Sequence, residues 1–358
     1  MSPAPPSSSD PGGGEAPRAS GALSRWLRPR TWWAWGRLVR LRLRGWGLGH
    51  LVATAVASTV FVASLWVIGQ ELQGFEYTEV WGYLRALPRG YVVTALGLTA
   101  LTFVVLTGYD ALALRYVGMD MSSRRIAFSA FVGYAVSQAI GNPILTGGSV
   151  RYRLYSLWGY SPTQVGKAVL FAGVSFWLGF CTLGGVLLLA APPSWVPALE
   201  LPLSSSVLGG VVLVPALAYA AVTLSRQAPI RVRGWQFDVP PRWMLPVQVW
   251  LAAGDLLLAS SVVFVLLPPD VGLGLPHVVV AYLIALLAGL ISHVPGGLGV
   301  FESLMLLMLT PEVAPPTVLG TLLAYRGLFH LLPLVLAALA FGAYELRRGL
   351  REAPAQTP

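Results

Sequence analysis

The strongest constraint on this chain is a series of apolar runs, each long enough to cross a lipid bilayer as a helix, which takes roughly 20 residues. Hydrophobic residues fill 55% of its 358 positions and charged residues only 11%. Soluble domains carry about 25% charged residues. Because lipid offers the backbone no hydrogen-bond partners, continuously apolar runs must fold as helices. The sequence therefore predicts an all-α polytopic membrane protein, a helical bundle with little soluble mass.

Six of the runs are predicted to span the membrane completely. They cover residues 48–68, 91–116, 164–190, 203–224, 243–267 and 317–344. The first run is longer than the apolar core of a signal peptide, which is about 7–15 residues, so we interpret it as a retained anchor.

Two further apolar segments are interrupted by glycine and proline, one in each half of the chain. The first reads GNPILTGGSVRYRLY over residues 141–155, and the second reads SHVPGGLGVFE over residues 292–302. Irregular backbone at membrane depth is tolerated only where it is buried in protein or lines a cavity. Broken apolar segments in both halves are typical of a transporter-type binding site.

The distribution of basic residues orients these segments, because cytoplasmic loops collect Lys and Arg. One assignment places 21 of the 24 basic residues on the cytoplasmic side, together with both termini. It requires that residues 126–160 enter and leave on the same side and that 275–310 return to their starting side. The first segment is then a re-entrant hairpin, and the second is either a re-entrant hairpin or two closely packed crossings. About eight membrane segments result, in the bacterial inner membrane.

The two ends of the chain differ from this membrane domain, which we place at residues 47–345. Residues 1–46 are predicted to form a basic arm, disordered at first and then an interfacial helix rich in Trp and Arg over 25–44. Residues 346–358 form a short cytoplasmic tail. The excess of basic residues does not indicate nucleic acid, because the arginines lie in the gaps between apolar runs.

Arg151 and Arg153 are the first candidate ligand-binding residues. They follow Gly147 and Gly148, where an extended backbone would point both guanidinium groups the same way, whereas a helix would separate them by roughly 200°. Arginine binds phosphate with two parallel hydrogen bonds. The pattern indicates a phosphate site, with general interfacial arginines as the alternative.

Charged residues inside apolar runs are the second set of candidates, because such charges are costly and usually face the interior or form pairs. They are Asp110, Asp255, Glu302 and Arg326. For Asp255 the alternative is a structural acid that pairs with another helix, with Arg326 as the partner. For Glu302 the alternative is a helix cap.

The turn Pro295, Gly296, Gly297 should end one helix and leave the start of the next half-helix facing inward. A helix N-terminus carries free N–H groups and positive partial charge, which suit an anionic headgroup.

Catalytic and cofactor sites are not indicated. Cys181 is a lone cysteine, so neither a disulfide nor a thiolate metal site is expected. No nucleotide, metal or haem motif appears, the histidines show no ligand spacing, and no nucleophile–base pair supports an enzyme. We expect no cofactor.

Four elements of the sequence resemble the transmembrane region of the lysylphosphatidylglycerol synthetase/flippase family. They are YDALALRY at 109–116, GNPILTGGSVRYRLYSLWGYSPTQ at 141–164, AGD at 253–255 and HVPGGLGVFE at 293–302. The resemblance covers residues 45–345 and implies a lipid-flippase module. It carries over Arg151, Arg153, Pro295, Gly296, Gly297 and Glu302 as site positions, with Asp110 and Asp255 matched less specifically.

In that family a soluble aminoacyl-transferase domain follows the membrane region, whereas this sequence ends at Pro358. The resemblance therefore implies a stand-alone flippase-like module. We expect a membrane phospholipid as the partner and no nucleic acid. The protein is compatible with a homo-oligomer. The alternative functions are a lipid headgroup transferase, a lipid-binding assembly protein that does not transport, and a carrier of a polyprenyl-phosphate lipid.

Overall fold

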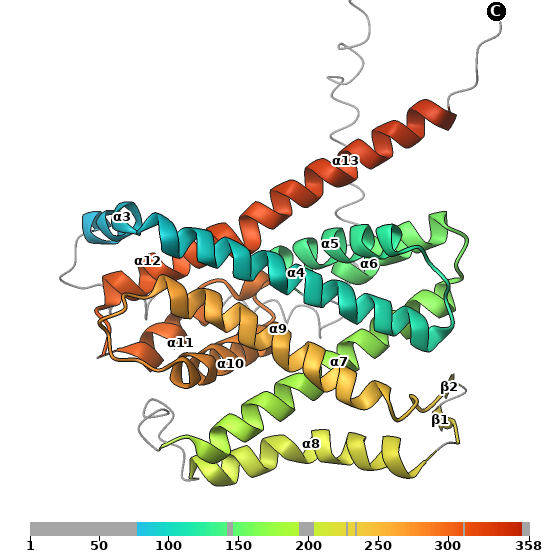
Figure 1. The fold of residues 1–358 in the computed structure, drawn as a ribbon, viewed down its shortest axis with the longest axis horizontal. Coiled ribbons are helices and arrows are strands. Elements are labelled where there is room, and N and C mark those ends of the chain that lie inside the picture. The colour runs from blue at the N-terminus through green and yellow to red at the C-terminus, as the bar shows by residue number, and fades with distance from the viewer. Residues whose placement is uncertain are drawn as a thin grey trace, which may run out of the picture. The chain divides into compact units, whose positions relative to one another are not determined.

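A computed structural model describes residues 77–141, 146–192, 204–226, 228–232, 235–310 and 312–352. Its elements are α3 (Tyr77–Ala86), α4 (Arg89–Val117), α5 (Ser123–Ile140), α6 (Thr146–Leu157), α7 (Pro162–Ala190), α8 (Ser205–Ser225), β1 (Ile230–Val232), β2 (Trp235–Phe237), α9 (Met244–Leu266), α10 (Leu275–Ser292), η3 (Pro295–Gly297), α11 (Val300–Leu309), α12 (Pro315–Tyr325), η4 (Arg326–Leu331) and α13 (Leu332–Glu352). Figure 1 shows their arrangement. The basic arm, the apolar run at 48–68 and the last residues of the tail lie outside the described part.

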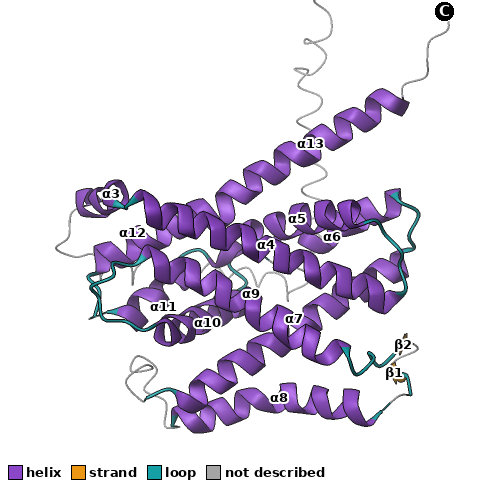
Figure 2. Cartoon of the chain, in the orientation of Figure 1, coloured by secondary structure: helices purple, strands orange, loops and turns teal. Residues whose placement is uncertain are grey.

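The predicted all-helical membrane bundle is confirmed for the described residues. Six helices there are long and apolar enough to cross a membrane: α4, α7, α8, α9, α10 and the continuous helix from Pro315 to Arg348. Five of them coincide with predicted spans, and α10 belongs to the segment 275–310, predicted as either a re-entrant hairpin or two closely packed crossings. One small departure lies in the basic loop after α8, where β1 pairs antiparallel with β2 (Figure 2).

Local sequence explains where the helices begin and change pitch. Ser161 and Gln164 cap α7 reciprocally, each accepting a hydrogen bond from the other's backbone N–H, and Pro162 occupies the first turn. Near the other end of the chain, Pro333 lacks the N–H that would continue an α-helix. The turn just before Pro333, at η4, is widened to a π-helix.

Helices α4 and α9 pack against each other in opposite directions. At one end, Arg115 in the last turn of α4 stacks on Trp243, which precedes α9, at 5.8 Å from the ring centroid. At the other end, Tyr83 of α3 donates a hydrogen bond to the carbonyl of Leu266 in the last turn of α9. Burial raises the pKa of the Tyr83 phenol, which keeps this donor protonated. These contacts fix the antiparallel pair at the centre of the fold.

Each of these two helices is followed by a hairpin that turns back within the bundle (Figure 1). After α4, α5 and α6 pack together, and α7 begins at the end where α5 began. After α9, α10 and α11 pack together, and α12 begins where α10 began. The short arms have 12 residues in α6 and 10 in α11, about 18 and 15 Å, too short for a hydrocarbon core of about 30 Å. Since α4 and α9 run in opposite directions, the hairpins enter from opposite ends.

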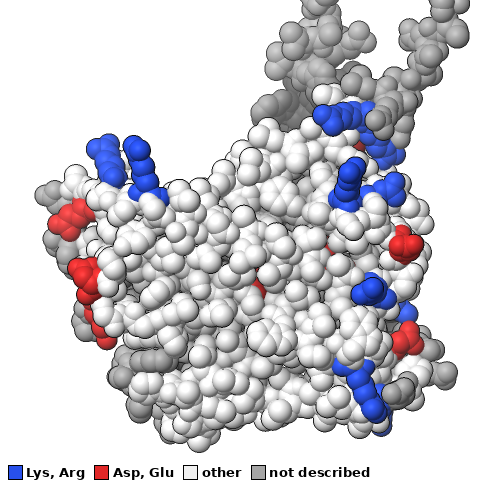
Figure 3. Space-filling model, in the orientation of Figure 1, with Lys and Arg blue, Asp and Glu red and all other residues white. Residues whose placement is uncertain are grey.

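Charged side chains separate to the two ends of the helices, with an uncharged belt between them (Figure 3). The basic end gathers Arg115 and Arg125, and the latter stacks on Trp158 at 5.3 Å. At the opposite end, Arg85 stacks on Trp81 at 5.4 Å, near Glu79. Such Arg–Trp pairs suit the interface between membrane and water, where aromatic rings concentrate. Large apolar side chains are exposed in the belt, including Val104, Leu217 and Trp250.

Gly147 and Gly148 provide a matched test of how closely α5 and α6 pack. A Cβ on Gly147 would lie 2.0 Å from Ser137 Oγ and 2.9 Å from the carbonyl oxygen of Gly133, whereas one on Gly148 would find only ordinary contact with Val169 at 3.6 Å. We expect Gly147→Ala to destabilise the protein by about 1–3 kcal/mol through overpacking. Gly148→Ala should be neutral or stabilising, because alanine favours a helix. Thermal unfolding in detergent would measure both, and equal effects would contradict the tight packing at Gly147.

Candidate functional site

The tips of the two hairpins meet inside the bundle. Gly141, which ends α5, approaches Gly296 of the Pro-Gly-Gly turn so closely that a Cβ on Gly141 would lie 2.8 Å from the Gly296 nitrogen. A Cβ on Gly296 would in turn lie 3.0 Å from the carbonyl oxygen of Ala139. Both glycines have positive φ, +85° and +64°. Only glycine allows this backbone contact, which we call the hairpin junction.

Arg151 forms a buried ion pair with Asp110, which joins α6 to α4. Its Nε donates to Asp110 Oδ2 at 2.8 Å and its Nη2 to Oδ1 at 3.0 Å, and the side chains are only 7% and 2% exposed. The Tyr155 hydroxyl donates to Oδ2 at 3.2 Å, and the guanidinium lies 4.2 Å from the Tyr134 ring centroid. This bidentate geometry satisfies both charges, which is what burial requires.

Arg153 lies apart from Arg151. Its side chain is 58% exposed and pairs with Glu345 of α13, with Nη2 at 3.0 Å from Oε1. The expectation of an extended segment that points both arginines the same way is wrong, because the helix α6 starts at Thr146 and includes them both. On a helix, positions i and i+2 diverge. Glycines at 147 and 148 do not extend this backbone; Gly147 instead lets α5 and α6 approach closely.

Glu302 and Arg326 fasten the Pro-Gly-Gly turn. Glu302 accepts a hydrogen bond from the Gly299 N–H at 2.8 Å and pairs with Arg326, whose Nη1 donates to the Gly296 carbonyl at 3.1 Å. Glu302 therefore does cap the half-helix, as the alternative interpretation predicted, and the same carboxylate also pairs with Arg326. The suggested pairing of Arg326 with Asp255 is wrong, because Glu302 takes that guanidinium.

Asp255 is buried in the middle of α9, 8% exposed. Ala252, on the same helix, packs directly against Gly179 of α7, where a Cβ would come within 2.1 Å of the alanine Cβ. Gln248, also on α9, is fully engaged by Ser175 at 2.9 Å and Tyr219 at 3.1 Å. The described residues give Asp255 no such hydrogen bond or ion pair.

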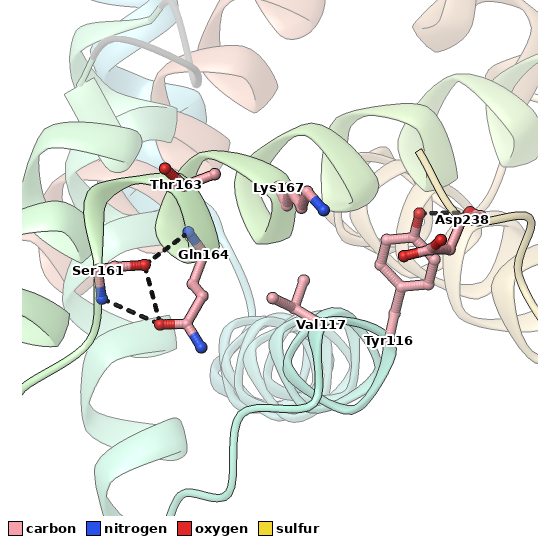
Figure 4. Close-up of a pocket in the computed structure, with 7 residues that line it drawn as sticks. All are labelled: Tyr116, Val117, Ser161, Thr163, Gln164, Lys167 and Asp238. Carbon is pink, nitrogen blue, oxygen red and sulfur yellow. Dashed lines mark hydrogen bonds between the residues drawn. The ribbon is translucent and has the colours of Figure 1, made fainter. Parts of the chain in front are cut away.

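A polar cavity of about 210 Å³ opens at the basic end of the bundle, away from the hairpin junction (Figure 4). Its walls come from the end of α4, the start of α7 and the segment before α9. The lining residues are Tyr116, Val117, Ser161, Thr163, Gln164, Lys167 and Asp238. Sequence analysis did not single out this cavity, because its residues come from three distant segments.

Several residues of the junction region also escaped sequence analysis. Tyr155 donates a hydrogen bond to Asp110, the Tyr134 ring faces the Arg151 guanidinium, and Glu345 pairs with Arg153. Tyr155 stands four positions after Arg151, on the same face of a helix, so a helical assignment of this segment would have found it. Glu345 lies far along the chain and carries no local signal.

Fold and site together define a multi-pass helical membrane protein with two broken hairpins whose tips meet beside the ion pair of Glu302 and Arg326. The chain belongs to the family described as "Lysylphosphatidylglycerol synthase TM region", which it matches over residues 50–338. The resemblance drawn from the sequence motifs is thereby confirmed.

Three relatives illustrate the range of this family. The uncharacterized protein slr0712 of Synechocystis is 36% identical over 84% of this chain and 94% of its own length. Inner membrane protein YbhN of Escherichia coli is 24% identical over 83% of this chain and 92% of its own. Phosphatidylglycerol lysyltransferase of Staphylococcus haemolyticus is 23% identical over 83% of this chain, but only 34% of that longer protein is covered.

Arg151 and Arg153 allow a controlled comparison on one helix. Arg151→Ala leaves the Asp110 carboxylate buried without its partner, which should cost about 3–5 kcal/mol of folding free energy. Arg153→Ala removes an exposed pair and should cost less than about 1 kcal/mol. Thermal unfolding of the two purified variants in one detergent checks the difference, and similar losses would show that the Asp110–Arg151 pair is not the buried contact described.

Proposed function

We propose that this protein binds an anionic phospholipid and moves it between the two leaflets of the membrane. The observation that carries the proposal is the hairpin junction. Two broken segments that enter from opposite ends bring glycine-rich irregular backbone together within an apolar bundle, whose helices also carry two ion pairs and the acid Asp255. Such discontinuous helices at mid-membrane are where transporters bind their substrates.

The candidate residues take distinct roles in this proposal. Arg153 lies exposed on α6, and its exposed ion pair is weak, so a lipid phosphate can replace Glu345 at little cost. The ion pair of Arg151 and Asp110, beside Gly147 and Gly148, is the next charged site that the lipid phosphate would meet on its way to the interior. Glu302 and the turn Pro295, Gly296, Gly297 then line the far hairpin.

The relatives support a lipid substrate. The staphylococcal proteins are named phosphatidylglycerol lysyltransferases, so their substrate is a membrane phospholipid. This chain shares their membrane region, which is the part that a lipid must cross. We therefore propose phosphatidylglycerol, or an anionic or aminoacylated lipid with the same phosphate, as the cargo.

We further propose that the basic end of the bundle faces the cytoplasm of a bacterial inner membrane, following the usual bias of Lys and Arg. The relative YbhN is itself named an inner membrane protein. In a Cys181→Ser background, Ser123→Cys marks the basic end and Ser206→Cys the opposite end, and both serines are exposed. A membrane-impermeant maleimide should label only the variant with cysteine at 206 in intact cells and both variants after permeabilisation. The reverse pattern would invert the topology.

The central test is lipid movement in proteoliposomes that contain fluorescent phosphatidylglycerol, followed by dithionite quenching of the outer leaflet. Replacing Arg151 and Arg153 together with alanine should abolish movement. Arg151→Gln combined with Asp110→Asn removes both buried charges without leaving one unpaired. We expect it to slow movement by about tenfold or more, equivalent to ~1.4 kcal/mol in the barrier.

Arg242→Ala is the matched control, because it also removes an exposed arginine from the basic end. It should transport as the unchanged protein does. Movement that persists in the variant lacking both Arg151 and Arg153, with correct insertion, would refute the phosphate-binding role. No movement by the unchanged protein over empty liposomes would refute translocation itself.

A further inference from the structure

One buried charge at the centre of the bundle has no counter-charge. Asp110 and Glu302 each hold an arginine, whereas Asp255 has no ion pair or hydrogen bond among the residues that the structure describes. Gln248, on the same helix, has both of its polar atoms engaged by Ser175 and Tyr219. The lack of a partner is therefore specific to Asp255 and is not shared by the other buried polar side chain, Gln248, on the same helix.

Phenol groups from both halves of the fold lie in the neighbourhood of this carboxyl group. The tyrosines close enough to interact with it electrostatically are Tyr109 of α4, Tyr134 of α5, Tyr282 of α10 and Tyr325 of α12. The hydroxyls of Tyr282 and Tyr325 lie 2.9 Å apart, and the Tyr109 hydroxyl is buried without a partner. Asp255 thus lies among helices of both hairpins.

Among the described residues, the remaining groups packed against α9 supply no compensating positive charge to Asp255. Helix α7 places Gly179 against Ala252 and Ser175 against Gln248, on the turns of α9 before Asp255. The arginines of neighbouring elements are held in the Asp110–Arg151 and Glu302–Arg326 pairs. His330 of η4 packs edge-on against Tyr325, and its Nδ1 is buried without a partner.

A proton is the ligand that this arrangement suits. A buried carboxylate without a partner is costly, and a proton neutralises it without needing extra space or several ligands. A metal cation would need a set of oxygen ligands around it. Ionisable residues of this kind inside membrane proteins form proton pathways.

We propose that Asp255 takes up a proton from one side of the membrane and releases it to the other in each transport cycle. The proposal rests on the proposed lipid translocation and supplies its energy source, the transmembrane proton gradient. Because Asp255 lies between the two hairpins, a change in its charge acts directly on the elements that meet at the junction. No redox step or covalent intermediate is involved.

A first experiment tests protonation without any lipid transport. Dicyclohexylcarbodiimide adds to protonated carboxyl groups in apolar surroundings, and mass spectrometry of peptides locates the adduct. We expect labelling of Asp255 in the purified protein, decreasing as pH rises, with little labelling of the paired acids Asp110 and Glu302. Infrared difference spectra between acidic and alkaline buffer detect a protonated carboxyl even if the reagent cannot enter. The absence of a carbonyl band that Asp255→Asn removes would overturn the proposal.

A second experiment measures coupling in proteoliposomes with an imposed pH gradient. The unchanged protein should move fluorescent phosphatidylglycerol several-fold faster with the gradient than without it. Asp255→Asn should lose that response, while Asp270→Asn, which removes an exposed acid just beyond α9, should keep it. Movement that ignores the gradient in the unchanged protein would overturn proton coupling and leave translocation intact. If no lipid moves at all, translocation fails, and the spectra still decide whether Asp255 binds a proton.

Discussion

The structure depends on one constraint: backbone groups freed by glycine and proline inside an apolar bundle must find partners within the protein. At the hairpin junction these partners are specific. The Gly141 N–H donates to the Ser137 carbonyl at 2.8 Å, and the Thr146 hydroxyl donates to the Gly141 carbonyl at 2.9 Å. On the other hairpin, Arg326 takes the Gly296 carbonyl and Glu302 takes the Gly299 N–H. The partly buried pair of Glu302 and Arg326 thus stabilises the irregular backbone of the second hairpin.

The same need for partners inside the protein explains why the two arginines of α6 differ so much in burial. Arg151 stands on the face that packs against α4 and α5, where Gly133 and Gly147 make room for its guanidinium. Arg153 stands on the opposite face, where its exposed side chain reaches the half-buried Glu345. A single helical segment therefore supplies one arginine that is fixed in the core and one that remains available at the surface. In the lipid translocation that we propose, the two would therefore take different parts.

Sequence patterns predicted five of the spans in the described residues, because long apolar runs follow from the thickness of the bilayer and clustered arginines mark the ends of the helices. They also located both hairpin tips, since glycine and proline mark broken helices. They failed at Arg151, where two glycines suggested extended backbone, although the segment is helical and Gly147 serves close helix packing. They failed again at Arg326, because nothing local distinguishes Glu302 from Asp255 as its partner. Contacts such as Arg153 with Glu345 join residues far apart in the chain, and only the packing of α13 on α5 and α6 brings them together.

The widened turn at η4 has a geometric consequence for the last helix. Each residue of an α-helix turns the chain by about 100°, and a π-turn accommodates one residue more than an α-turn. Arg326 at the start of this turn donates to the Gly296 carbonyl at the junction. Farther along, Glu345 pairs with Arg153 of α6, and Tyr344 accepts a hydrogen bond from Trp158, just after α6. The extra residue rotates the part of the helix that carries Tyr344 and Glu345 relative to the part that carries Arg326, so that both sets of contacts can form. If the turn reverted to ordinary pitch, one attachment would have to swing away, so the long C-terminal helix connects the centre of the bundle mechanically to the rim at its basic end.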